Sequence, residues 1–247
     1  MGVELVLVGV FVGVVSGFFG VGGGAILVPI LLYMGFDMKA AIGISIVQMV
    51  FSSLFGTYLN YKKGTLRIGT TIFFGIGGFI GALFSGYIVH ALSTKTLTWI
   101  FLGVILFAIY RFFKAPALSD KAVIENRALF LVIGIMIGMF STSIGIGGAL
   151  LLTPIMVGFL HYDVKTAVST ALFFVVFSSL SGLISLSRYG YIDYEHGLLI
   201  GVASLLGAYI GIELSHKTEA KKHKKYILWL NFITLALIIN KLIQQGL

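Results

Sequence analysis

The sequence contains no cysteine, which excludes disulfide bonds and thiolate metal sites. Charge is also scarce: only 11% of the 247 residues are Asp, Glu, Lys or Arg, against roughly 25% in a soluble domain. Hydrophobic residues, by contrast, make up 58% of the chain. This balance excludes an ordinary soluble domain and indicates an integral membrane protein surrounded by a lipid bilayer.

The apolar runs are separated by short charged stretches. Most are long enough for transmembrane helices, which need about 20 residues to cross a bilayer core of roughly 30 Å. We therefore predict an all-α, polytopic transmembrane helix bundle. Residues 1–19 lack the basic start and the cleavage site of a signal peptide, so we expect a retained membrane segment there. The net charge of +8 does not indicate a nucleic-acid partner, because Lys and Arg lie almost wholly in the loops.

Two glycine-rich stretches interrupt apolar sequence: GVGGGAILVP from Gly20 to Pro29, and GIGGALLLTP from Gly145 to Pro154. Glycine lets the backbone leave helical geometry, and a proline disfavours an uninterrupted helix. In lipid, irregular backbone survives only where protein or a watery cavity satisfies its polar groups. Each stretch therefore predicts a re-entrant hairpin, whose second helix presents unpaired N–H groups and a positive dipole end to an anion.

The two stretches belong to a duplicated unit. An offset of 125 aligns Ser16 with Ser141 and Gly23 with Gly148. After one inserted residue, an offset of 126 aligns two FSSL runs, at residues 51–54 and 177–180. Chance does not keep one register over so long a stretch, so the chain is an internal repeat.

We expect a first membrane repeat over residues 1–113, a polar linker over 114–126 and a second membrane repeat over 127–247. Each repeat is expected to contain one glycine-broken hairpin and three long helices. In the first repeat these helices are predicted near residues 38–61, 68–92 and 96–113. Asp37 and its counterpart Asp163 are at helix starts, where aspartate is a preferred N-cap.

The positive charges predict how the repeats are oriented. If each hairpin turns back, the second repeat is inverted, and all but four of the 17 Lys and Arg share one side of the membrane; the four are Lys39, Lys95, Arg188 and Lys241. If each broken segment crosses once, the same 17 residues divide 9 to 8. Cytoplasmic loops carry an excess of Lys and Arg. We therefore predict two inverted repeats in the inner (plasma) membrane, with both termini on the non-cytoplasmic side.

We expect a small anion to bind near the bilayer midplane, where the tips of inverted hairpins approach each other. No Lys or Arg lies at the centre of any span, so the donors are helix N–H groups, hydroxyls and the amide of Gln48. Close helix packing and hydrogen bonds to the residue's own helix are the alternative roles. The substrate-binding candidates are Ser16, Gly22, Gly23, Gly24, Gln48, Ser52, Ser141, Thr142, Ser143, Gly147, Gly148 and Ser178.

Neither an enzyme nor a metal centre is predicted. The sequence has no H-E-x-x-H motif, no nucleophile elbow and no embedded acid pair, so we expect no catalytic residue and no cofactor. The histidines are expected in loops or near a helix end, without the spacing of a metal site. A ten-segment metabolite exporter of another family and a non-transporting membrane scaffold are the alternatives to an anion transporter.

The stretches GVGGGAILVP and GIGGALLLTP, half a chain apart, resemble those of the TauE/SafE family of membrane permeases. The resemblance covers essentially the whole chain. It implies a secondary transporter of small sulfur-containing anions such as sulfite, sulfoacetate or other organosulfonates, with a coupling proton or cation and a homo-oligomer as open partners. The second stretch has Ala149 where the first has Gly24, so the two tips need not bind equally.

Overall fold

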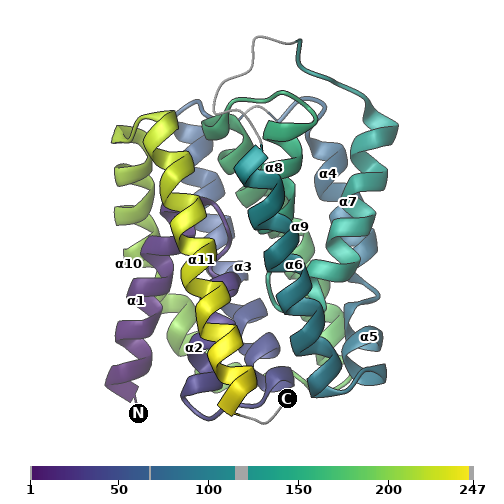
Figure 1. Cartoon of the computed structure of the whole chain (residues 1–247), viewed down its shortest axis with the longest axis vertical. Coiled ribbons are helices and arrows are strands. Elements are labelled where there is room, and N and C mark those ends of the chain that lie inside the picture. The colour runs from purple at the N-terminus through teal and green to yellow at the C-terminus, as the bar shows by residue number, and fades with distance from the viewer. Residues whose placement is uncertain (1, 67, 115–121, 245–247) are drawn as a thin grey trace.

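A computed structural model describes residues 2–66, 68–114 and 122–244, and all regular structure within these ranges is α-helical. Seven spans in this part of the chain are long and apolar enough to cross a membrane, one of them formed by α4 and α5 together. The predicted multi-pass helix bundle is therefore confirmed (Figure 1). The helices are α1 (Gly2–Phe19), α2 (Gly24–Tyr33), α3 (Met38–Lys62), α4 (Ile72–Ala82), α5 (Ser85–Ala91), α6 (Thr94–Lys114), α7 (Arg127–Thr142), α8 (Ala149–Gly158), α9 (Val164–Ser187), α10 (Tyr194–Lys217) and α11 (Ala220–Gln244).

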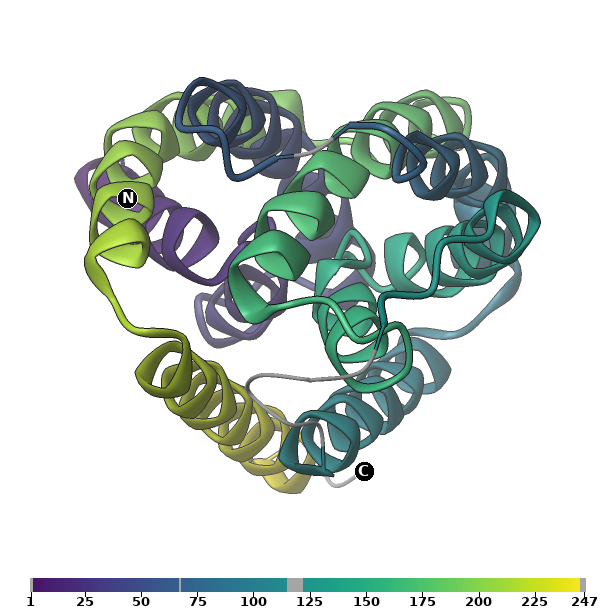
Figure 2. The ribbon, with the colours of Figure 1, turned by 90° about the horizontal axis from the view of Figure 1, so that it is seen from above.

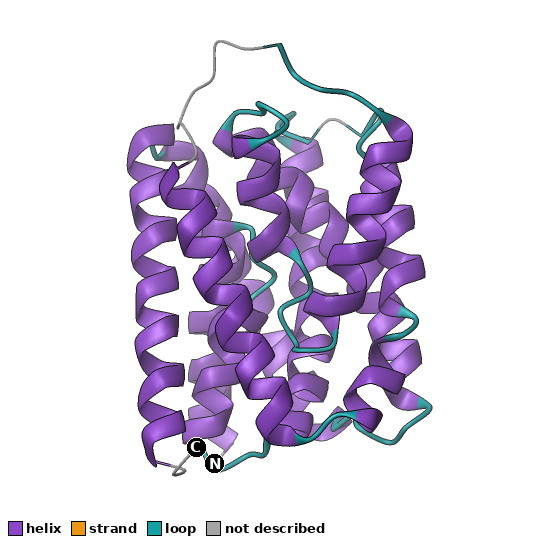
Figure 3. Cartoon of the chain, turned by 45° about the vertical axis from the view of Figure 1, so that its right-hand side comes forward, coloured by secondary structure: helices purple, strands orange, loops and turns teal. Residues whose placement is uncertain are grey.

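Both glycine-rich stretches break a helix, as the sequence predicts. The first break separates α1 from α2, and the second separates α7 from α8. Side chains rarely adopt a positive φ, which explains why glycine occupies the turning points. Figure 3 shows loop segments well inside the bundle, between its two ends. The φ angles at matched glycines agree: 67° at Gly20 and 74° at Gly145, 74° at Gly22 and 72° at Gly147, 89° at Gly23 and 99° at Gly148.

The two central helices start at the predicted aspartate caps. Oδ1 of Asp37 accepts hydrogen bonds from the N–H groups of Lys39 and Ala40, at 2.8 and 3.1 Å. Oδ1 of Asp163 accepts one from Thr166 N–H at 2.9 Å. The helices that follow, α3 and α9, are the most deeply buried of the spans. Seen from above, α6 and α11 lie together at one edge of the bundle (Figure 2).

One predicted helix is interrupted. The sequence suggested a single helix over residues 68–92, but α4 ends at Ala82 and α5 begins at Ser85. At this point Phe84 N–H donates to the carbonyl of Gly81, three residues back. The hydroxyl of Ser85 donates to the Ala82 carbonyl at 2.7 Å. A serine hydroxyl that bonds to its own helix competes with the backbone ladder, and such positions bend helices.

The two halves of the chain interlock. Helix α1 packs against α10 and α4 against α7, while α3 packs against α9 and α6 against α11. If each helix is replaced by its counterpart in the other half, the contact of α1 with α10 becomes that of α7 with α4, and the contacts of α3 with α9 and of α6 with α11 are unchanged. In Figure 1, α1 begins and α11 ends at the same end of the bundle, and α2 and α8 lie in opposite halves of it. Glycines allow the close packing, since a methyl group on Gly77 or Gly81 of α4 would overlap the backbone of α7.

Gly24 tests how closely the two breaks pack. A methyl group on Gly24 would overlap the carbonyl oxygen of Gly145 in the other break. We expect Gly24→Ala to cost about 1–3 kcal/mol of stability, because backbone at a buried site cannot move aside as a flexible side chain can. Thermal unfolding of the detergent-purified protein measures this as a lower Tm. Gly103→Ala is the matched control, since nothing lies within 4 Å of the added methyl group; equal Tm values for the two variants would contradict the prediction.

Candidate functional site

The two helix breaks meet inside the bundle between α3 and α9. A methyl group on Gly22 of the first break or on Gly147 of the second would contact the same two side chains, Met49 of α3 and Val175 of α9. Met49 and Val175 are themselves matched positions, 126 residues apart. The structure therefore brings together the glycines at the two hairpin tips, as the sequence analysis expected.

Serines of the repeated FSSL runs hold the broken backbone. The hydroxyl of Ser52 donates to the carbonyl of Gly22 at 3.2 Å, and the hydroxyl of Ser178 donates to the carbonyl of Gly147 at 2.7 Å. All four groups are buried. These bonds satisfy carbonyls that the helix no longer pairs, and unpaired polar groups are costly in an apolar interior. Both serines thus lie at the tips, with their protons already committed to the backbone.

Other buried polar side chains, at the helix ends beside the breaks and on α3, have no partner. Their accessible surface is 0% in each case, and their polar atoms make no hydrogen bond within the protein. A buried polar group without a partner is rare in folded proteins, and a bound ligand is one explanation for it. These side chains are Ser16 at the end of α1, Ser45 and Gln48 on α3, and Ser141 and Thr142 at the end of α7.

The sequence left open an alternative role for Ser16 and Ser141, in which each hydroxyl bonds to a carbonyl of its own helix. Neither hydroxyl makes that bond. Ser143, in contrast, donates to the carbonyl of Met139 at 2.6 Å. It also lines an apolar groove with Tyr87 and Phe140, so it is not grouped with the unpaired side chains.

The polar groups are distributed unevenly between the breaks. Gln48 lies against Gly23, because a methyl group on that glycine would meet both amide atoms. The matched position in the second half is Phe174, whose ring lies in the same way against Gly148. Aligning the two halves of the sequence pairs Gln48 with Phe174, so this difference could have been predicted without the structure.

No formal charge is buried with these groups. Among the residues that the structure describes, none of the fully buried polar side chains is Lys, Arg, Asp or Glu. The positive ends of α2 and α8 are the local electrostatic feature, and no side chain caps either helix start. A neutral, donor-rich cluster of this kind suits a small anion of low charge.

His223 was missed as a contact to the first break. The sequence placed it in a loop, but it lies in α11 and is fully buried. Its Nε2 is 2.7 Å from the carbonyl oxygen of Phe18, in the last turn of α1 before the break. The apolar run of α11 begins four residues later, which is why composition alone suggested a loop.

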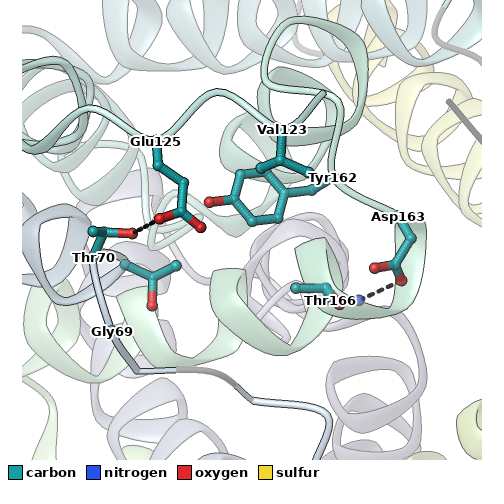
Figure 4. Close-up of a pocket in the computed structure, with 8 residues that line it drawn as sticks. Gly69, Thr70, Val123, Glu125, Tyr162, Asp163 and Thr166 are labelled. Carbon is teal, nitrogen blue, oxygen red and sulfur yellow. Dashed lines mark hydrogen bonds between the residues drawn. The ribbon is translucent and has the colours of Figure 1, made fainter. Parts of the chain in front are cut away.

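The central helices each begin beside a cavity. The larger, about 360 Å³, lies at the start of α9 and includes Glu125, Tyr162 and Thr70 (Figure 4). There the hydroxyl of Thr70 donates to Glu125 at 3.3 Å. Burial and the neighbouring Glu125 carboxylate raise the pKa of the Tyr162 phenol, which therefore keeps its proton. A cavity of about 300 Å³ lies at the start of α3, beside Asp37 and Tyr191.

Comparison with known proteins agrees with this architecture. The family model described as "Sulfite exporter TauE/SafE" matches residues 5–238. The probable membrane transporter protein YdhB of Bacillus subtilis is 27% identical over 86% of this chain and 89% of its own length. YunE of the same organism, with the same description, is 26% identical over 99% of this chain and 98% of its own length. A probable membrane transporter protein of Methanocaldococcus jannaschii is 26% identical over 88% of this chain and 87% of its own length.

No solved structure matches the chain. The family match spans nearly the whole sequence, and the relatives are named as transporters rather than enzymes. The chain is therefore a membrane transporter and belongs to the TauE/SafE sulfite exporter family.

Proposed function

We propose that this transporter moves small sulfur-containing anions, such as sulfite or an organosulfonate, by binding them between the two helix breaks. The observation that carries the proposal is the group of unpaired, fully buried donors at the breaks, represented by Ser16, Gln48 and Ser141. A sulfite or sulfonate group offers several acceptor oxygens to such donors. The starts of α2 and α8 add the positive ends of two helix dipoles.

The two halves of the chain are in contact at both ends of the bundle. Contacts between the two halves hold one end: Thr65 bonds to Ser169 at 3.1 Å, Asn60 to His216 at 3.1 Å, and Lys63 forms an ion pair with Glu213. The other end has His90 bonded to Tyr191 at 3.1 Å. These contacts support an occluded state of an alternating-access cycle, in which each end opens in turn.

We further propose that the repeats are inverted. The helix contacts that recur when the halves are exchanged support this, as do the opposite positions of α2 and α8 in Figure 1. In inverted repeats the substrate site lies at the repeat interface near the midplane, and one repeat moves against the other. The end that carries Lys63 and Lys165 is then the cytoplasmic one, because it has most of the positive charge.

Substrate flux tests the function. Purified protein in proteoliposomes is expected to accelerate sulfite uptake over empty vesicles. The double variant Ser16→Ala with Ser141→Ala should lower the rate at subsaturating sulfite about tenfold or more, since each hydrogen bond to an anion contributes about 1.5–3 kcal/mol. Ser187→Ala is the control, because this exposed hydroxyl bonds to its own helix. Protein that neither binds nor moves any sulfur oxyanion would overturn the substrate assignment.

Membrane orientation is tested by cysteine labelling, for which the cysteine-free chain gives no background. We expect Arg188→Cys, at the end of α9, to react with a membrane-impermeant maleimide added to intact cells. Lys62→Cys, at the matched end of α3, should react only after the cells are permeabilised, because the charge distribution puts it on the cytoplasmic side. Both residues are exposed. Labelling of both residues from the same side would refute the inverted arrangement, and the reverse pattern would refute the predicted orientation.

A reversible cross-link tests alternating access. The hydroxyls of Thr65 and Ser169 are 3.1 Å apart and join the first half to the second. We expect the pair Thr65→Cys and Ser169→Cys to form a disulfide under mild oxidation and to abolish sulfite flux in proteoliposomes. Dithiothreitol should restore the flux, and each single variant should be insensitive to oxidant. Full flux through the cross-linked protein would show that this end does not need to open.

A further inference from the structure

The amide of Gln48 imposes a condition on the ligand that the hydroxyls around it do not. A serine hydroxyl donates or accepts as required, but a glutamine amide presents a fixed acceptor, Oε1, beside a fixed donor, Nε2. Both atoms are buried and neither has a partner in the protein. An anion with acceptor oxygens alone would satisfy Nε2 and leave Oε1 unpaired. It would also place negative charge beside the carbonyl dipole of the amide.

The condition applies to one break only. Phe174 occupies the position opposite Gly148 that Gln48 occupies opposite Gly23. One turn earlier in α3, Ser45 is also buried and unpaired, whereas its counterpart in α9 is Ala171. The second break contributes the unpaired hydroxyls of Ser141 and Thr142, which donate or accept as required. The side chain with a fixed acceptor therefore lies at the first break.

The charge of the ligand is limited as well. None of the fully buried polar side chains in the described ranges is a Lys or Arg. Two helix dipole ends and neutral donors stabilise one negative charge, whereas a second charge in the same low-dielectric site would have no counter-ion. A doubly charged ligand such as sulfoacetate thus fits less well than a singly charged one.

We propose that the transported species is a singly charged oxyanion that carries its own O–H donor, and that Gln48 pairs with both parts. Nε2 donates to an oxygen of the anionic group, and Oε1 accepts the O–H of the ligand. Hydrogen sulfite and a hydroxyalkanesulfonate both have this chemistry. The inference rests on the proposed anion transport and narrows its substrate class.

Two probes of nearly the same size test the inference. 2-Hydroxyethanesulfonate and ethanesulfonate are both monoanions, and they differ by one hydroxyl group. We expect the hydroxyl-bearing probe to bind the purified transporter at least tenfold more tightly in a thermal-shift titration, and to compete correspondingly better in proteoliposome uptake. The second comparison is hydrogen sulfite with methanesulfonate. In hydrogen sulfite the O–H group belongs to the oxyanion itself, whereas in 2-hydroxyethanesulfonate it belongs to the alkyl chain, so the two comparisons distinguish these two sources of the donor.

Variants assign the preference to Gln48. In Gln48→Leu the ratio of the two affinities should fall to about one, because the loss of Oε1 removes the acceptor for the hydroxyl. Gln48→Met keeps the length of the side chain and serves if the leucine variant does not fold. Phe174→Leu is the matched control at the second break, and there the ratio should stay at its wild-type value.

The outcomes separate the inference from the proposed function. Equal binding of both probes by the wild-type protein would overturn the inference and leave sulfur-anion transport standing. If both Gln48 variants keep the wild-type preference, another group recognises the hydroxyl, and the inference is overturned as well. If none of the four probes binds or competes, the proposed function itself fails.

Discussion

A broken helix inside a membrane must pair its exposed backbone groups within the protein, and this constraint organises the fold. At each break a serine of a neighbouring central helix supplies the pairing: Ser52 bonds to the carbonyl of Gly22, and Ser178 bonds to that of Gly147. Because these bonds come from α3 and α9, those helices must lie beside the breaks in the middle of the bundle. The outer helices then shield the central region from lipid.

The duplicated sequence folds into two equivalent helix breaks. A small ligand without two-fold symmetry cannot make the same contacts with both of them. The repeats have kept the parts that shape the breaks, namely the positive-φ glycines and the serines that bond to them. They differ where a side chain faces the break, with Gln48 in one half and Phe174 in the other. The halves therefore share the architecture of the breaks and differ in the side chain that faces each break.

Much of this arrangement could be predicted from the sequence, because it follows from local physical rules. The length of apolar runs fixed the spans, Asp37 and Asp163 marked helix starts, and clustered glycines marked the breaks. The interruption between α4 and α5 was missed, since it depends on how the hydroxyl of Ser85 competes for a carbonyl. Which hydroxyls remain unpaired also depends on packing: Ser16 has no partner, whereas Ser143 bonds to its own helix.

The two ends of the bundle are held by contacts of similar, modest strength. At one end Lys63 pairs with Glu213, but both side chains are about one-third exposed, and exposed ion pairs contribute little. At the other end Lys39 lies over the ring of Tyr191, 5.2 Å from its centre, which is another weak attraction. Neither of these two contacts is strong, so breaking either one costs little free energy. In the alternating-access cycle proposed above, a ligand shifts the equilibrium between the two open states only by its differential affinity for them. A site shared by the two breaks fits such a cycle, because contacts of this kind recur in both halves.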